Sequence, residues 1–271
     1  YEFLPNSMQA WHYGRYKQKL NNISKVVTAV GEWNPPVLVG LCEVENDSVL
    51  RDLVKYSPLK EFGYRYIITH SPDERGIDVA LLYQRGSFRL IDHDSIRIVF
   101  PDNPLKHTRD ILHVTGQVMN GDSLDVFVCH FPSRTGGEKE SEPNRILAAS
   151  LLKHYTDSLF TVRTHPNIII MGDFNDYPNN KSISEVLNAK ALSSTPEDKK
   201  LYNLMAERAK DKTFGTYKYQ GEWNILDQFI VSGFLLNNKS GLCTSVKNAG
   251  ISNLPFLLEK DEKYSGVKPL R

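Results

Sequence analysis

The sequence predicts an α/β protein in which two packed mixed β-sheets are flanked by helices. Short apolar runs typical of buried strands occur in both halves of the 271-residue chain. One long helical segment precedes the first of these strands and another lies between two groups of them, and no linker or low-complexity stretch divides the chain. We therefore expect one domain over residues 1–271.

The first half of the chain is predicted to hold two helices and six strands. A helix over residues 15–30 is indicated by apolar residues at spacings of three and four, and Gly31 is a natural stop. A second helix is expected over residues 47–56. The strands are expected over residues 37–41, 64–69, 79–83, 88–99, 111–119 and 124–129, with a hairpin turn at 120–122.

The second half is predicted to contain one long helix, a buried strand and a final hairpin. The helix is expected to run from Pro143 to about residue 160, with Pro143 in its first turn. The remaining elements are a strand over 167–171, short helices near 183–188 and 201–210, and a hairpin of 214–219 with 225–232 around Gln220 and Gly221.

Composition leaves several function classes open. The formal net charge is +1, so the whole chain creates little field to attract a polyanion, and a nucleic-acid footprint would have to be local. No apolar run approaches the ~20 residues of a membrane span. Residues 1–10 lack the features of a signal peptide, but a trimmed secreted chain would look the same. We expect a soluble monomer, with secreted, periplasmic and cytoplasmic locations all open.

Cysteine usage argues against a zinc site or a disulfide framework. The three cysteines are far apart in the sequence and form no CxxC motif. Cys42 and Cys129 lie in apolar, strand-like runs, so we expect both to be small buried hydrophobic residues.

Two predicted strands end in acidic and amide side chains. Residues 37–41 lead into Glu43 and Glu45, and residues 168–171 lead into Gly-Asp-Phe-Asn-Asp. A carboxylate at the end of an apolar strand is costly unless it is paired or binds a metal. Glu43 is therefore a candidate ligand for Mg²⁺, although the two glutamates could instead cap the next helix or lie in solvent.

The Gly-Asp-Phe-Asn-Asp segment offers a carboxylate and an amide close together. Asp173 and Asn175 could project from it as an acceptor and a donor toward a phosphate oxygen. Gly172 would let the backbone approach a ligand closely. The alternative is an Asx turn followed by a helix cap.

Three further polar residues lie at strand ends or inside strands. His130 precedes Arg134 and two glycines, a combination that suits a phosphate ester but is also compatible with a structural histidine. Asp78 begins a predicted strand and could orient a histidine or simply start the strand. Asp227 is flanked by apolar residues and needs a partner that the sequence does not identify.

These segments resemble ordered motifs of the endonuclease/exonuclease/phosphatase superfamily. The motif residues are 41–44, His130, 172–175 and 226–227, and the resemblance extends from about residue 15 to 232. Residues 11–16 and 130–137 most resemble a bacterial nuclease-like branch. The superfamily includes pancreatic-type deoxyribonucleases, apurinic endonucleases, neutral sphingomyelinases and inositol-polyphosphate phosphatases. The resemblance implies a four-layered α/β sandwich and hydrolysis of phosphate esters with Mg²⁺, or Mn²⁺ as the alternative.

The resemblance also implies roles for individual residues. Glu43 is similar to the metal-binding glutamate, Asp173 to the aspartate that activates water, and Asn175 to the amide that holds the phosphate. Asp78 and His130 resemble a carboxylate–histidine pair beside the scissile phosphate. The remaining candidates are Asp227, similar to a carboxylate that orients a C-terminal histidine, and Arg134, which the residues themselves suggest as a phosphate contact. We expect six of these side chains to converge at one mouth of the sandwich: Glu43, Asp78, His130, Asp173, Asn175 and Asp227.

Two family features have no counterpart in this sequence. The first-strand asparagine is not matched, since Asn6 does not lie in a strand-like run, and the terminal Ser-Asp-His motif is absent. We therefore expect the first and last strands to be missing and this chain to be less active than a longer version carrying Asp-His. A nuclease or phosphodiesterase is the first hypothesis. The alternatives are a phosphatase or sphingomyelinase-type esterase, and a catalytically inactive binding module.

Overall fold

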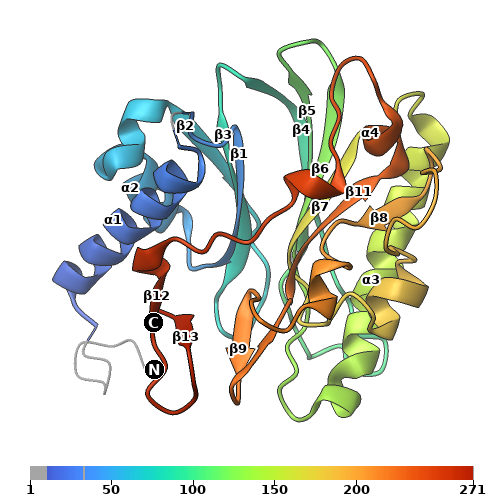
Figure 1. Cartoon of the computed structure of the whole chain (residues 1–271). Helices are drawn as coiled ribbons and strands as arrows, with labels where there is room; N and C mark the ends of the chain where they lie inside the picture. The colour runs from blue at the N-terminus through green and yellow to red at the C-terminus, as the bar shows by residue number, and fades with distance from the viewer. Residues whose placement is uncertain (1–10, 33, 271) are drawn as a thin grey trace.

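The computed structural model describes residues 11–32 and 34–270, so Asn6 and the rest of residues 1–10 lie outside it. It shows a layered α/β sandwich (Figure 1). Helices α1 (Tyr13–Val30) and α2 (Asp47–Tyr56) cover a small sheet, which packs on a larger one. Helix α3 (Glu138–Val162) covers the far face of the larger sheet. The predicted pair of packed sheets with flanking helices is confirmed. No helix in the described part of the chain combines the length and hydrophobicity needed to cross a membrane.

The small sheet consists of β1 (Leu38–Val44), β2 (Tyr64–Ile68) and β3 (Asp78–Gln84), in the order β1-β3-β2. Both pairings are antiparallel, so only the larger sheet is mixed. Side chains of the central strand, β3, point alternately into two hydrophobic cores, because successive residues of a strand face opposite sides of the sheet. Ala80 and Leu82 face the helices, whereas Leu81 faces the larger sheet.

The larger sheet has the strand order β4-β5-β6-β7-β11-β8. Its strands are β4 (Phe88–Ile96), β5 (Ile111–Val118), β6 (Ser123–His130), β7 (Ile168–Asp173), β8 (Leu201–Asn203) and β11 (Asp227–Ser232). Strands β6 and β7 are parallel and are joined by α3, while every other neighbouring pair is antiparallel. The parallel pair brings the carboxyl ends of two strands to the same edge of the sheet.

The long helix begins earlier than predicted. It starts at Glu138, and Pro143 lies inside it rather than in its first turn. The buried Arg145 side chain holds the extra turn, because its Nη2 donates to the Glu138 carbonyl at 2.8 Å and its Nη1 to Ser141 Oγ at 2.7 Å. These hydrogen bonds within α3 offset the backbone donor that proline lacks.

Two predictions in the second half of the chain were wrong. The segment 201–210, expected to be a helix, is strand β8 followed by a short 3₁₀ segment. Residues 201–203 form a strand because they pair with β11. The chain does turn at Gln220 and Gly221, as expected, but the predicted pairing of 214–219 with 225–232 is wrong. Strand β9 (Tyr217–Tyr219) pairs with β10 (Glu222–Asn224). Residues 227–232 form β11, which lies between β7 and β8 in the larger sheet.

The remaining elements are short. A π-helical turn, η2, occupies part of the helix expected near 183–188. The bounds are η1 (Pro58–Phe62), η2 (Ser182–Val186), η3 (Arg208–Lys210), α4 (Gly233–Asn237), η4 (Val246–Asn248), η5 (Pro255–Leu257), β12 (Leu258–Lys260) and β13 (Val267–Pro269). Strands β12 and β13 form a hairpin beside β9 (Figure 1).

Asp125 is a buried carboxylate that ties α3 to the sheet. It accepts hydrogen bonds from Thr115 Oγ1 at 2.6 Å and Arg163 Nε at 2.8 Å, and His113 Nε2 lies 3.0 Å away. Burial alone would raise its pKa, but the hydrogen bonds from His113, Arg163 and Thr115 outweigh burial and lower the pKa to about 2. The ionised form of Asp125 therefore stabilises the fold.

We expect Asp125→Asn to lower the free energy of unfolding by roughly 2–3 kcal/mol at pH 7, because a carboxylate whose pKa is about 2 when folded and about 3.9 when unfolded stabilises the fold by an amount of that order. The folded pKa is below the unfolded value of about 3.9, so this contribution is complete above about pH 4 and is lost as the pH falls toward 2. Guanidinium unfolding at pH 7 and pH 3 measures both effects. The control is Asp157→Asn, which removes an exposed α3 pair with Lys153 and should have little effect. Equal unfolding midpoints for Asp125→Asn and wild type would contradict the assignment.

Candidate active site

Three adjacent strands place polar side chains at one edge of the larger sheet. His130 ends β6, Asp173 ends β7 and Asp227 begins β11. The strand register sets His130 opposite Asp173, and Asp173 opposite Asp227. His130 Nε2 lies 3.8 Å from Asp173 Oδ2. Three residues separated by as many as 97 positions in the sequence (130 to 227) therefore become direct neighbours through strand pairing alone.

Gly172 allows this close packing of β6 and β7. Its φ angle is +134°, and a Cβ atom at this position would lie 2.0 Å from the carbonyl oxygen of Cys129. The sequence suggested that this glycine admits a ligand. The structure shows instead that it admits the neighbouring strand, which sets the distance between the ends of β6 and β7.

Asn175 lies in a tight turn immediately after β7. Its φ angle is +50°, and its N–H donates to Asp173 Oδ1 at 2.8 Å, which forms the Asx turn that the sequence allowed here. Its Nδ2 donates to the Phe131 carbonyl at 2.9 Å, and its own carbonyl accepts from Arg134 Nε at 2.6 Å. The Asx turn thus fixes Asn175 beside Asp173, so the structural and the functional interpretation are compatible.

Glu43 reaches the same end of the sandwich from the small sheet. The β1–β3 register is irregular between Leu41 and Val44, and Glu43 has a φ angle of +59°. The Sγ of Cys42 contacts the Cys129 carbonyl at 3.4 Å, which joins the end of β1 to the end of β6. The Glu43 carboxylate is 56% exposed and lies 2.9 Å from Arg75 Nη2. It does not cap α2, because Asn46 is the N-cap.

Asp78 is held by its own loop rather than by His130. Its Oδ1 accepts from Thr69 Oγ1 and from the Ser71 N–H, both at 2.8 Å. Within residues 11–32 and 34–270, no hydrogen bond or ion pair joins Asp78 to His130, and His130 Nδ1 is buried without a hydrogen-bond partner. The structure thus shows no direct contact between the expected carboxylate and histidine, and the Thr69 and Ser71 donors both bind Oδ1 of Asp78.

Arg109 is a buried cation beneath the site that the sequence analysis missed. Its Nη2 donates to the Phe131 carbonyl at 2.6 Å, the same oxygen that accepts from Asn175. Its Nη1 lies 3.3 Å from Asp73 Oδ2, and both side chains are almost fully buried. Nothing in the local sequence around Arg109 distinguishes it from a surface arginine, since its burial results from tertiary packing.

Burial raises the pKa values of Asp173 and Asp227 and lowers that of His130. Burial, followed by the charges of Asp227 and Glu43, raises the pKa of Asp173 to about 6. Burial, assisted by the positive charges of Arg109 and Arg75, lowers the pKa of His130 to about 3. The residue Asp227 is partly exposed, but burial of its carboxylate raises the pKa of this group as well. At neutral pH the site therefore combines a neutral imidazole with a carboxylate that is easily protonated.

The donor set fits a metal ion held through a single protein carboxylate. In the described part of the chain, no three His, Cys, Asp or Glu side chains are grouped to hold a metal. Mg²⁺, however, commonly takes one or two carboxylates and completes its shell with water and phosphate oxygens. The Glu43 carboxylate is accessible, and its charge helps to raise the pKa of Asp173. A cation bound to Glu43 would relieve this repulsion between carboxylates.

A pocket of about 420 Å³ opens beside the aligned strand ends. Its lining residues are Arg134, Thr135, Asp173, Asn175, Tyr177, Tyr217 and Leu226. The Arg134 guanidinium stacks 4.1 Å from the Tyr177 ring centroid and also contacts Asp176 and Glu138. Its nitrogens are thus engaged with the turn that carries Asn175, and its contact with phosphate stays a prediction.

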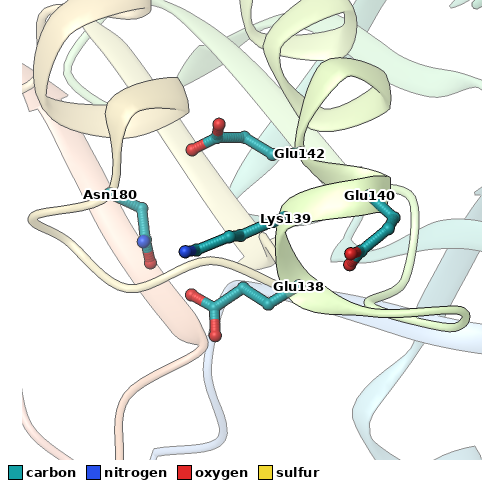
Figure 2. A pocket seen from close by; sticks show the side chains of 5 residues that line it. All are labelled: Glu138, Lys139, Glu140, Glu142 and Asn180. Carbon is teal, nitrogen blue, oxygen red and sulfur yellow. The ribbon is translucent and has the colours of Figure 1, made fainter.

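A larger hollow of about 610 Å³ lies at the start of α3. Figure 2 shows Lys139 reaching toward Asn180 among the surrounding carboxylates. Its lining residues are Glu138, Lys139, Glu140, Glu142 and Asn180. Three glutamates against one lysine would repel a phosphate ester, so the smaller pocket is the better candidate for substrate.

The sequence matches the model of the Endonuclease/Exonuclease/phosphatase family over residues 1–271. The chain belongs to this family. Members of the endonuclease/exonuclease/phosphatase family act on phosphate esters and generally depend on a divalent metal ion. No curated protein matches the chain.

Solved structures of the family share the fold of this chain. The human nocturnin catalytic domain with bound sulfate is 20% identical, with a TM-score of 0.57, covering 82% of this chain and 76% of that one. Humanised D. rerio TDP2 is 13% identical, with a TM-score of 0.57 and coverage of 82% and 78%. The Bacteroides thetaiotaomicron mannosyl-6-phosphatase is 16% identical, with a TM-score of 0.56 and coverage of 80% and 77%.

Proposed function

We propose that this protein is a Mg²⁺-dependent hydrolase of phosphodiesters, and most specifically a nuclease. The observation that carries this proposal is the alignment of His130, Asp173 and Asp227 across three strands, beside Asn175 and a pocket. Family membership supports phosphate-ester chemistry in general. The pKa displacements support acid–base chemistry at this edge of the sheet.

The reaction we propose is in-line attack of water on phosphorus, in which the opposite ester P–O bond breaks and the leaving oxygen takes a proton from solvent. Asp173 accepts the proton of the water, because a carboxylate with a pKa of about 6 is ionised at neutral pH and is still an effective base. The neutral His130 and the amide of Asn175 donate hydrogen bonds to phosphate oxygens. Asp227, whose charge raises the pKa of Asp173, strengthens that base. Asp78 supports the loop beside the site through Thr69 and Ser71.

Glu43 would hold the metal ion, which when bound supplies positive charge to neutralise the phosphate and the leaving oxygen. Arg75 already pairs with Glu43, so this arginine is positioned to add a second positive charge close to the phosphate. Mn²⁺ has similar oxygen preferences and is the alternative ion.

A phosphatase acting on small monoesters is the second candidate, and two observations favour it. The pocket of about 420 Å³ is at the low end of the range for small-molecule sites. The net charge of +1 gives no general attraction for a long polyanion. The sequence also leaves open a sphingomyelinase-type esterase and a catalytically inactive binding module.

An assay of the full-length protein with Mg²⁺ separates these candidates. The substrates are plasmid DNA, abasic DNA, RNA, sphingomyelin and inositol phosphates, each with and without EDTA. We expect EDTA-sensitive cleavage of a nucleic acid. Hydrolysis of only the small phosphates would replace the nuclease by the phosphatase, and no hydrolysis of any substrate would favour the binding module.

We expect Glu43→Gln to weaken Mg²⁺ or Mn²⁺ binding at least about tenfold in calorimetry, because an amide is a poorer ligand for a hard cation than a carboxylate. Glu45→Gln is the matched control, since Glu45 is an exposed glutamate two residues away. Equal metal binding by wild type and Glu43→Gln would remove Glu43 from the metal site, whatever the enzymatic activity.

A further inference from the structure

Strand β9 presents two tyrosine rings beside the candidate active site. Tyr217 and Tyr219 are two residues apart and therefore share one face of the strand, whereas Lys218 points to the other face. Their rings are nearly parallel, with 10° between the planes and 6.2 Å between the centroids. The two residues are 37% and 58% exposed. Part of each tyrosine therefore remains accessible to solvent.

The opposite face of β9 anchors the hairpin firmly. Lys218 Nζ lies 2.9 Å from Asp261 Oδ2 and donates to the carbonyls of Ser265 and Val267, both at 3.0 Å. The two charged side chains are only 4% and 6% exposed. Trp223, the partner of Lys218 across the hairpin, is buried. The backbone of β9 is therefore anchored before any substrate binds, which reduces the entropy lost on binding.

The rings continue from the groups proposed to act on the phosphate. Tyr217 lines the same pocket as Asp173 and Asn175. Tyr177 also lines it, and the Arg134 guanidinium and Lys212 Nζ lie 4.1 Å and 5.6 Å from its ring centroid. The pocket thus joins the polar groups proposed to act on the phosphate to Tyr217, and β9 continues from there to Tyr219.

We propose that β9 is a stacking platform for unpaired nucleobases, so that the substrate is a single-stranded nucleic acid. The base next to the scissile phosphate stacks on Tyr217 and the following base on Tyr219. Every base offers a planar face to such a ring, whereas a duplex covers these faces with neighbouring base pairs. This inference rests on the proposed function in one respect, namely that Asp173 and Asn175 locate the phosphate.

Binding of a short fluorescein-labelled oligothymidylate, measured by anisotropy in EDTA, tests the platform without turnover. We expect Tyr217→Ala to weaken binding roughly tenfold, Tyr219→Ala to weaken it less, and Tyr217→Phe to bind like wild type. Tyr56→Ala is the control, because Tyr56 is 75% exposed on α2, on the far side of the small sheet. Circular dichroism of each variant checks the fold.

Three results would overturn the platform: unchanged binding by both Tyr217→Ala and Tyr219→Ala, equal affinity for the matching duplex, or equal competition by an abasic oligonucleotide of the same length. Hydrolysis is measured separately in Mg²⁺. Loss of hydrolysis with every substrate would remove the proposed function, whereas the anisotropy in EDTA decides the platform in either case.

Discussion

Asp173→Asn should lower the rate of phosphate-ester hydrolysis by about 10²–10⁴-fold, the usual contribution of a positioned base. The amide is nearly the same shape and can still accept from the Asn175 N–H, so the turn after β7 should persist. It cannot, however, accept a proton from water. Asp157→Asn, on the exposed face of α3, is the matched control and should retain the wild-type rate.

The pH dependence of the wild-type rate gives an independent test of the same role. Because the pKa of Asp173 is raised to about 6, the base is protonated below that pH, and the rate should rise with pH and level off above 6. A cation at Glu43 removes one cause of this raised pKa, so higher Mg²⁺ should move the rise to lower pH. A rate independent of pH between 5 and 7, or an active Asp173→Asn, would show that another group accepts the proton.

Arg145→Leu should lower the free energy of unfolding by about 3–5 kcal/mol, because it leaves the Asp176 carboxylate buried without its main counter-charge. The two side chains are 0% and 1% exposed, and Arg145 Nε lies 2.7 Å from Asp176 Oδ1. The variant also loses the hydrogen bonds that hold the first turn of α3 at Glu138 and Ser141. Asp176 directly follows Asn175, so the same change should loosen the candidate active site.

Guanidinium unfolding measures the effect of Arg145→Leu on stability. Lys153→Met is the control within α3, since it removes an exposed pair with Asp157 worth less than about 1 kcal/mol. Adding Asp176→Leu to Arg145→Leu should recover part of the loss, because no unpaired charge then stays buried. Two other groups contact the Asp176 carboxylate, since Ser182 Oγ donates to Oδ2 at 2.5 Å and Arg134 Nη2 lies 3.4 Å from Oδ1. A loss below about 1 kcal/mol for Arg145→Leu alone would mean that these two contacts suffice to stabilise the carboxylate.

Elements whose signals are local could be predicted from the sequence. Helix α2 has the predicted bounds because Asn46 caps its start and Ser57 and Pro58 follow its end. The start of α3 could not be predicted, since it depends on Arg145 reaching back to Glu138. The segment beginning at Leu201 has a helix-like composition, yet it becomes a strand through pairing with distant β11.

The same distinction applies to the candidate site. His130 and Asp173 could be selected because polar residues directly after buried strands stand out in the sequence. Arg109 and Tyr217 could not, because their importance comes from a shared carbonyl and a shared pocket wall. The Asp78–His130 pair was inferred from family resemblance, and in the structure the Asp78 Oδ1 atom accepts hydrogen bonds from its own loop instead.

The buried contacts of Lys218 join β9, which carries Tyr217 and Tyr219, to the C-terminal hairpin of β12 and β13. The ammonium group contacts the Asp261 carboxylate and the carbonyl oxygens of Ser265 and Val267, which lie just before β13 and at its first residue. A ligand that restrains β9 should also restrain β12 and β13 through these contacts. By thermodynamic reciprocity, a restraint on the β12–β13 hairpin should likewise reduce the motion of β9. We therefore expect occupancy of the pocket to make the C-terminal hairpin, which does not line that pocket, more resistant to proteolysis.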